Sequence, residues 1–137
     1  MVSPKTHLAI FILLAVIISG VGCNRTSARK SSEPVAPVLK IAFDLDRLNE
    51  AGLYGPPDGL RALSYEFCIP AREDYADEVK AIDPTIDISA GSPGRVDCSE
   101  DQFLCMGNTH QKNFREVLLR LAALPYVDRI EESVFEQ

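Results

Sequence analysis

The stretch from Leu60 to Ile69 constrains the fold more than any other part of this 137-residue chain. Large apolar side chains occupy every second position in it: Leu63, Tyr65, Phe67 and Ile69. The positions between them hold Ala62, Ser64, Glu66 and Cys68. A period of two predicts a β-strand with one buried face, and Pro70 ends it because proline lacks the N–H that a ladder needs. Ser64, Glu66 and Cys68 are therefore expected on an open, polar face of a sheet.

Two helices are predicted downstream, because apolar residues recur at spacings of three and four. The first follows Pro70 and ends at Asp83-Pro84. Its apolar stripe consists of Tyr75, Val79 and Ile82. The second has five apolar residues on one face: Phe114, Val117, Leu118, Leu121 and Ala122. Asn113 followed by Glu116 fits a capping arrangement at the start of this second helix.

The segment before the central strand is less clearly patterned. A short helix is expected from Asp44 to Ala51, with Gly52 as its left-handed C-terminal residue. A strand from Val38 to Phe43 is the alternative. The glycines and prolines of residues 55–59 predict a turn that leads into the central strand.

Further strands are predicted on both sides of the second helix. Thr85 to Ser89 alternates apolar and polar residues and predicts a strand that Arg95 to Cys98 resumes after a loop or bulge at residues 90–94. Gln102 to Met106 is expected to be the hairpin partner of this strand. Val127 to Phe135 would form a last, charged edge strand. The order strand, helix, strand, strand, helix, strand is that of the ferredoxin-like βαββαβ fold. We therefore expect one small α+β domain over residues 38–137, an antiparallel sheet with both helices on one face.

The N-terminus has the features of a targeting segment. Lys5 and His7 precede an apolar run of eleven residues from Leu8 to Ile18, which is too short to span a hydrocarbon core of about 30 Å. Residues 1–22 are therefore predicted to be a signal peptide; a membrane-spanning helix, with the apolar segment extended from Leu8 to Val21, is the alternative. Val21-Gly22-Cys23 resembles the end of a bacterial lipobox, so Cys23 is expected to carry a lipid; ordinary cleavage after Gly22 is the alternative. Residues 23–37 are rich in serine, proline and basic residues and predict a flexible linker.

The charge of the remaining chain excludes one class of partner. From Val38 onward there are ten Lys or Arg residues and nineteen Asp or Glu residues. A nucleic-acid-binding surface needs clustered basic residues to contact phosphates, and no such stripe is present in the sequence. Nucleic acid is therefore not expected as a partner.

The cysteines support two competing hypotheses. An exported protein meets an oxidising environment, so a disulfide between Cys98 and Cys105 is expected, with Cys68–Cys105 as the alternative pairing. Either pairing leaves one thiol over. The competing hypothesis is a metal-binding or thiol-active site, because Cys68, Cys98, Cys105 and His110 include the ligand types of a tetrahedral zinc site. Their spacing lacks the usual Cys-x-x-Cys pair.

Several segments together resemble one family. They are Ser64–Pro70, Ala81–Pro84, Gly91–Arg95 and Leu104–Gln111. In these segments the chain is similar to a family of small exported proteins, with lipoprotein features, found mainly in cyanobacteria. The resemblance covers residues 52–136. It implies the boundary of the folded domain and carries no implication about an activity.

The sequence contains no set of residues typical of an active site. A phosphate-binding glycine loop, a dinucleotide fingerprint and a catalytic triad are all missing, so neither a cofactor nor enzymatic activity is predicted. We expect a membrane-tethered lipoprotein of the cell envelope, facing the periplasm or the cell exterior, that binds an envelope protein or a small molecule. Its expected contact surfaces are the sheet face with Ser64 and Glu66 and the loop of Asn108, Thr109, His110 and Gln111. In that loop, Asn108 or Thr109 would cap the following helix, or the loop would hold an anion.

Overall fold

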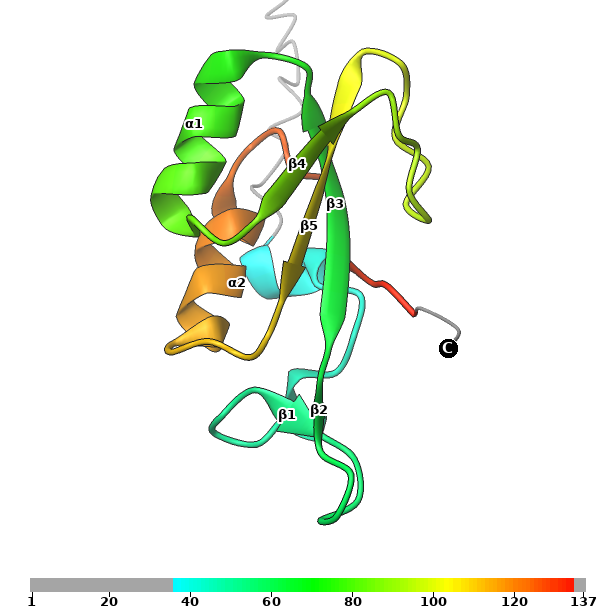
Figure 1. The fold of residues 1–137 in the computed structure, drawn as a ribbon. Coiled ribbons are helices and arrows are strands. Elements are labelled where there is room, and N and C mark those ends of the chain that lie inside the picture. Colours follow the sequence, from blue (N-terminus) through cyan, green and yellow to red (C-terminus); the bar gives the residue numbers. More distant parts are fainter. Residues whose placement is uncertain (1–35, 135–137) are drawn as a thin grey trace, which may run out of the picture. The chain divides into compact units, whose positions relative to one another are not determined.

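The computed structural model describes residues 36–134, which form an α+β arrangement with two α-helices and two antiparallel sheets (Figure 1). The larger sheet has four strands in the order β4-β5-β3-β6, and the smaller is the hairpin β1-β2. The helical elements are the 3-10 helices η1 (Pro37–Lys40) and η2 (Leu45–Arg47) and the α-helices α1 (Glu73–Ile82) and α2 (Phe114–Ala123). The strands are β1 (Leu53–Tyr54), β2 (Arg61–Ala62), β3 (Ser64–Pro70), β4 (Asp87–Ala90), β5 (Gln102–Asn108) and β6 (Glu131–Glu132). None of the helices described is long and apolar enough to cross a membrane.

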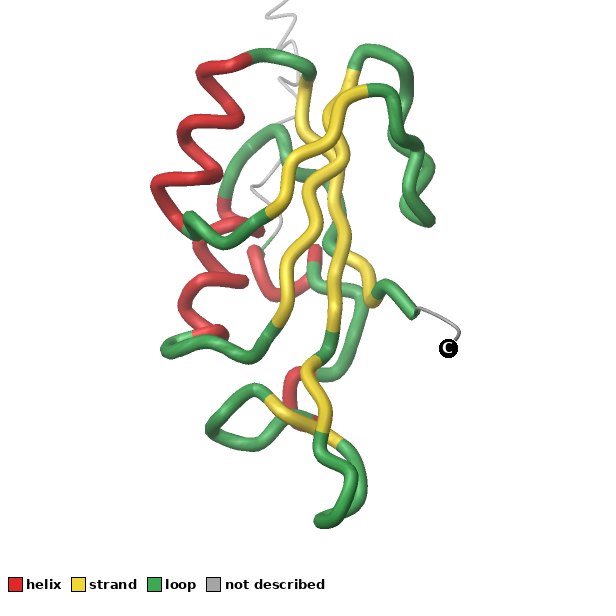
Figure 2. Tube along the Cα trace, viewed as in Figure 1, coloured by secondary structure: helices red, strands yellow, loops and turns green. Residues whose placement is uncertain are grey.

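The central strand is confirmed. β3 pairs with β5 along its whole length, from Ser64 opposite Asn108 to Pro70 opposite Gln102, and with β6 on its other side. Tyr65, Phe67 and Ile69 are at most 1% exposed, so the alternating apolar residues do line the core. Figure 2 shows β3 and β5 as the longest strands, running side by side through the middle of the sheet.

Both predicted α-helices are confirmed, and both lie on the same side of the four-stranded sheet (Figure 1). The core between helices and sheet is built from residues that include Leu63, Tyr65, Phe67, Ile69, Val79, Ile86, Phe114, Leu118, Leu121, Val127 and Ile130. The predicted capping of α2 is wrong. Asn113 occupies the N-cap position, but its backbone is left-handed, with φ 58°, and its side chain makes no capping hydrogen bond. A capping side chain normally reaches the first amides from extended backbone.

The N-terminal part of the domain differs from both predictions made for it. Only Leu45–Arg47 is helical within the expected helix, and the expected strand from Val38 to Phe43 is replaced by η1 and one isolated parallel bridge between Ile41 and Ile130. The Ala42 N–H donates to the Ile130 carbonyl, and the Ile130 N–H donates to the Lys40 carbonyl, each at 2.8 Å. Residues 40–42 therefore cover the outer edge of the sheet next to β6.

The last strand is shorter than predicted. Only Glu131–Glu132 is a strand. Val127 belongs to a turn, in which its N–H donates to the Leu124 carbonyl, and Ile130 forms only the isolated bridge to Ile41. Phe135, the predicted end of that strand, lies outside the described residues.

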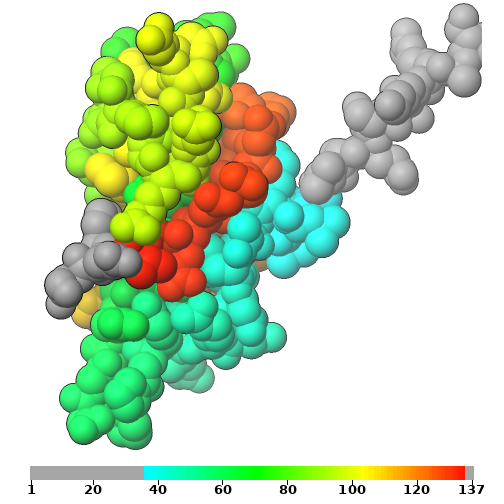
Figure 3. Space-filling view, turned by 90° about the vertical axis from the view of Figure 1, so that its right-hand side faces the viewer, coloured from blue at the N-terminus to red at the C-terminus, as the bar shows by residue number. Residues whose placement is uncertain are grey.

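The predicted strand from Arg95 to Cys98 is wrong, because these residues form a turn. Gly94 and Asp97 have φ values of 59° and 60°, which no strand accommodates. β5 pairs with β4 instead, from Asp87 opposite Met106 to Ala90 opposite Phe103. Residues 91–101, here called the covering loop, leave the sheet on the side opposite the helices (Figure 2). In Figure 3 this loop (yellow-green) and the segment before the C-terminus (red) lie next to each other on that face.

Candidate functional site

A disulfide between Cys68 and Cys98 attaches the covering loop to β3, with 5.5 Å between the two Cα atoms. Both predicted pairings with Cys105 are therefore wrong. Cys105 lies opposite Phe67 in the ladder, so its side chain is on the helix side of the sheet, fully buried. Cys68 lies one position further along β3, and neighbouring residues of a strand point to opposite faces.

The same geometry excludes the predicted metal site. Cys68 and Cys98 are joined to each other, Cys105 lies on the other face, and His110 is exposed. Within residues 36–134, no group of three or more His, Cys, Asp or Glu side chains is placed to hold a metal ion. A thiol-active role for the remaining cysteine is unfavourable too, because burial raises the pKa of the Cys105 thiol to about 12.

Glu66 does not lie on an open face as predicted but is 3% exposed beneath the covering loop. One carboxylate oxygen accepts a hydrogen bond from the Arg95 N–H at 2.7 Å, and the other accepts one from the Ser133 hydroxyl. Gly94 lies so close that a Cβ there would be 2.7 Å from the Glu66 Oε2 atom. Glu66 therefore attaches both the covering loop and the C-terminal segment to the sheet. No local sequence pattern indicated that Arg95 and Ser133 would donate hydrogen bonds to this carboxylate.

The loop after β5 does not cap α2 as predicted; its polar side chains make hydrogen bonds that hold other parts of the fold. The Thr109 side chain is fully buried: its Oγ1 accepts from the Leu63 N–H at 3.0 Å and donates to the Gly52 carbonyl at 2.5 Å. Asn108 accepts a hydrogen bond from the His110 N–H at 3.0 Å, which closes a local turn. Thr109 thus joins the β1-β2 hairpin to the four-stranded sheet, and neither residue caps α2.

Asp83 is the acceptor of a second buried network, below the C-terminal end of α1. Its carboxylate accepts hydrogen bonds from the Thr85 N–H and hydroxyl, from the Gln111 amide at 2.9 Å and from the Tyr65 hydroxyl at 3.3 Å. Burial by itself would raise the pKa of Asp83, but these hydrogen bonds outweigh it and lower the pKa below its ordinary value. The Tyr65 ring lies against Gly107, where a Cβ would be 2.5 Å from the ring. Gly107 therefore leaves the space that this ring occupies.

Replacing Asp83 with Asn should reduce stability in a pH-dependent way. The pKa of Asp83 is lower in the folded protein than in the unfolded chain. The charged carboxylate therefore stabilises the fold at pH values above the ordinary Asp pKa of about 3.9. This contribution is lost as the pH falls through the lower pKa of the folded state. At pH 7 the Asn variant should be less stable by about 2 kcal/mol, because hydrogen bonds to a charged acceptor are lost. Urea unfolding at pH 7, 5 and 3 measures this difference. A difference that does not shrink toward pH 3 would contradict the role of the carboxylate charge.

Part of the sheet face remains accessible beside the covering loop. A hollow of about 220 Å³ is lined by Ser64, Tyr65, Thr85, Asp87, Met106, Gly107, Asn108 and Ser133. Ser64 and Asn108, both predicted contact residues, lie directly opposite each other in the β3-β5 ladder. The structure therefore brings together two of the predicted contact residues, while Glu66, Thr109 and Gln111 serve internal hydrogen bonds.

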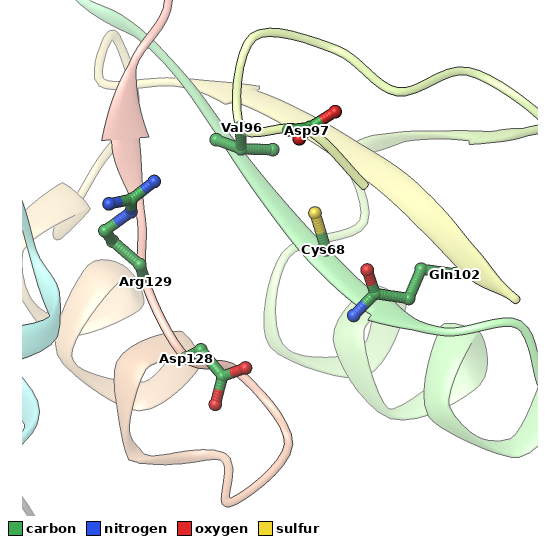
Figure 4. Close-up of a pocket in the computed structure, with 6 residues that line it drawn as sticks. All are labelled: Cys68, Val96, Asp97, Gln102, Asp128 and Arg129. Atoms are coloured by element: carbon green, nitrogen blue, oxygen red, sulfur yellow. The ribbon is translucent and has the colours of Figure 1, made fainter. Parts of the chain in front are cut away.

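A second hollow, of about 250 Å³, lies next to the disulfide and is drawn in Figure 4. Its walls come from the covering loop (Val96, Asp97), from β5 (Gln102) and from the segment before β6 (Asp128, Arg129). The Arg129 guanidinium is paired with Glu131 at 2.8 Å, so its charge is already balanced. Cys23 and the predicted signal peptide lie outside the described residues. Comparison with family models, with curated proteins and with solved structures found no match for the chain.

Proposed function

We propose that the chain is an exported, lipid-anchored module of the cell envelope that binds a partner protein and has no catalytic activity of its own. The observation that carries the proposal is the hollow at Ser64 and Asn108, a polar and accessible part of a sheet face beside the covering loop that the disulfide fastens. A disulfide in a small domain is typical of oxidising compartments, which supports export. The sequence around Cys23 supports a lipid anchor, and the resemblance to small exported cyanobacterial proteins agrees with both.

The absence of catalytic activity is supported by where the reactive groups lie. The free thiol of Cys105 is buried, and burial raises its pKa. His110 is exposed and follows the C-terminal end of β5, whereas the disulfide lies near the N-terminal end of that strand. The buried carboxylates of Glu66 and Asp83 are occupied by hydrogen bonds within the fold. A general base or nucleophile has to reach a substrate, and these groups face internal partners.

We also propose that the domain has the ferredoxin-like topology. Two connections support it: β3-α1-β4 and β5-α2-β6 each pass through a helix, and the two strands of each connection are separated in the sheet by one other strand. This is the split βαβ arrangement of that fold. The β1-β2 hairpin and the two 3-10 helices are additions to it.

Photocrosslinking in intact membranes tests the binding function. Asn108→p-benzoylphenylalanine should yield one discrete crosslinked protein after irradiation, because the side chain lies at the hollow. The matched control is Leu60→p-benzoylphenylalanine, at a residue that is 46% exposed just before β2. Cys23→Ser should release the protein from the membrane fraction. Equal crosslinking from both positions, or none from Asn108, would contradict the proposal.

A further inference from the structure

The two edges of the four-stranded sheet differ within residues 36–134. The edge at β6 is only two residues long, and residues 40–42 cover it at Ile130, directly before β6, through two backbone hydrogen bonds. At the other edge, β4 pairs with β5 only. β4 is four residues long and contains one charged residue, Asp87, but it has neither the proline nor the lysine with which natural edge strands often prevent further pairing. The edge at β4 is therefore the one at which another strand can be added.

The hydrogen-bond pattern identifies the groups that this edge presents. The Thr109 N–H donates to the Leu63 carbonyl at 2.9 Å, and the Ala71 N–H donates to the Asp101 carbonyl at 2.8 Å. In an antiparallel ladder the bonded residues alternate, so the odd-numbered residues of β5 bond toward β3 and the even-numbered ones toward β4. Asp87 and Ser89, opposite Met106 and Leu104, then bond inward to β5.

Ile88 and Ala90 consequently direct their N–H and carbonyl groups away from the sheet. Ile86 has the same parity, and its carbonyl accepts a hydrogen bond from the Lys80 ammonium group. The Lys80 side chain therefore occupies the outward-facing carbonyl at the N-terminal end of the β4 edge. Two residues with outward-facing backbone groups remain beyond it.

A groove runs beside this edge on the helix side of the sheet. It has a volume of about 360 Å³ and is lined by Glu73, Ala76, Asp77, Lys80, Ile88, Ala90 and Phe103. Ile88 and Ala90 lie opposite Cys105 and Phe103, so the apolar part of the lining comes largely from the sheet. Glu73 and Asp77 are exposed carboxylates one helical turn apart on α1. A strand added to β4 would place every second side chain in this groove.

We infer that β4 accepts an extended segment of the partner protein as an additional strand, with lysine or arginine side chains entering the groove between α1 and β4. The aliphatic stem of such a side chain covers Ile88 and Phe103, and its charged end reaches Glu73 and Asp77. The alternate side chains of the segment lie on the opposite face, near Asp87 and the hollow. The inference rests on the proposed binding function and specifies how the partner is bound.

Charge favours a basic partner over a second copy of the chain. The chain carries twenty Asp or Glu residues against fourteen Lys or Arg residues. Antiparallel pairing of two β4 strands would put both α1 helices on the same face of the joined sheet, with their acidic groups near each other. Like charges in that position oppose self-association, whereas a basic segment is attracted.

The test measures binding of a fluorescent probe peptide, acetyl-Lys-Val-Lys-Val-Lys-Val-amide, to the purified full-length protein by anisotropy. The control peptide has Glu in place of Lys and should not bind. Ala90→Pro should weaken binding of the probe at least tenfold, because proline removes an outward N–H but none of the bonds to β5. Asp77→Lys, at an exposed helix position, should weaken it severalfold and leaves the edge itself intact. Urea unfolding of both variants shows whether each is folded.

Three outcomes overturn the inference. The first is probe binding that neither variant changes. The second is a dimer in sedimentation velocity that Ala90→Pro dissociates, which would assign the edge to a second copy. The third is a discrete crosslink at Asn108 that persists in Ala90→Pro, which would leave the proposed binding function intact and refute only the added strand. A separate outcome concerns the binding function itself. That function would be refuted if Asn108→p-benzoylphenylalanine, with no other substitution in the protein, gave no crosslinked product.

Discussion

Removing the Cys68–Cys98 disulfide should lower the free energy of unfolding by about 3 to 4 kcal/mol. The bond joins residues 30 positions apart, and the entropy lost by an unfolded chain closed into a loop of that length corresponds to this value. Without the bond, the covering loop is attached mainly through Glu66 and the side chain of Leu104 near Gly94. Urea unfolding of the oxidised protein and of the Cys68→Ala/Cys98→Ala double variant measures the difference.

Two controls separate the disulfide from other effects. Dithiothreitol should destabilise the wild-type protein but leave the double variant unchanged. Peptide mapping without reductant should recover Cys68 and Cys98 in one linked product, with Cys105 alkylated only after unfolding because it is buried. A disulfide that includes Cys105, identified after cleavage at Glu100 has separated Cys98 from Cys105, would contradict the assigned role of the bond. A stability difference below about 1 kcal/mol would contradict it too.

Gly52→Ala should destabilise the fold on the order of 3 kcal/mol or more. Gly52 has a φ of +73°, and a Cβ there would lie 1.8 Å from the carbonyl oxygen of Thr109. The clash is with backbone, so no side-chain rotation relieves it, and Thr109 is the residue that joins the β1-β2 hairpin to β3. Chemical unfolding followed by circular dichroism measures the loss.

Gly91→Ala is the matched control for this substitution. Gly91 has almost the same φ, +70°, but a Cβ there would meet nothing within 4 Å. Only the cost of left-handed backbone remains, so this variant should lose about 1 kcal/mol. Equal losses in the two variants would mean that backbone conformation, and not the contact with Thr109, decides the effect at Gly52.

The sequence predicts those elements whose signal is local. β3, α1 and α2 are confirmed because each buries one face, and burial on one face imposes a period of 2.0 or 3.6 residues on the sequence. The α+β class follows from the same periods. The short 3-10 helices near the N-terminus lack such a period, and the isolated bridge from Ile41 to Ile130 depends on a contact between distant parts of the chain.

The errors at the candidate site have a different cause. A polar residue between apolar ones, such as Glu66, indicates which face of a strand it occupies but not whether a loop covers that face. The sequence pattern predicts a hairpin between Cys98 and Cys105, and with it a disulfide that joins them. In the structure, residues 95–98 are not a strand, so Cys98 is not paired with Cys105 across a hairpin. The alternation along β5 places Cys105 on the helix side of the sheet, and Cys68, on the other face, is the cysteine that lies close to Cys98.

The contacts of residues 40–42 also determine how the domain responds to mechanical force. Any pull on the chain ahead of Pro37 acts first on the two hydrogen bonds to Ile130 and on the Lys40 ammonium group, which donates to the carbonyls of Leu124 and Val127. We expect these contacts, together with the burial of Ile41 in the core, to be lost before the ladders around β3 and β5 are. The initial extension under tension is therefore the detachment of the segment before β1, while the disulfide keeps the covering loop on the sheet.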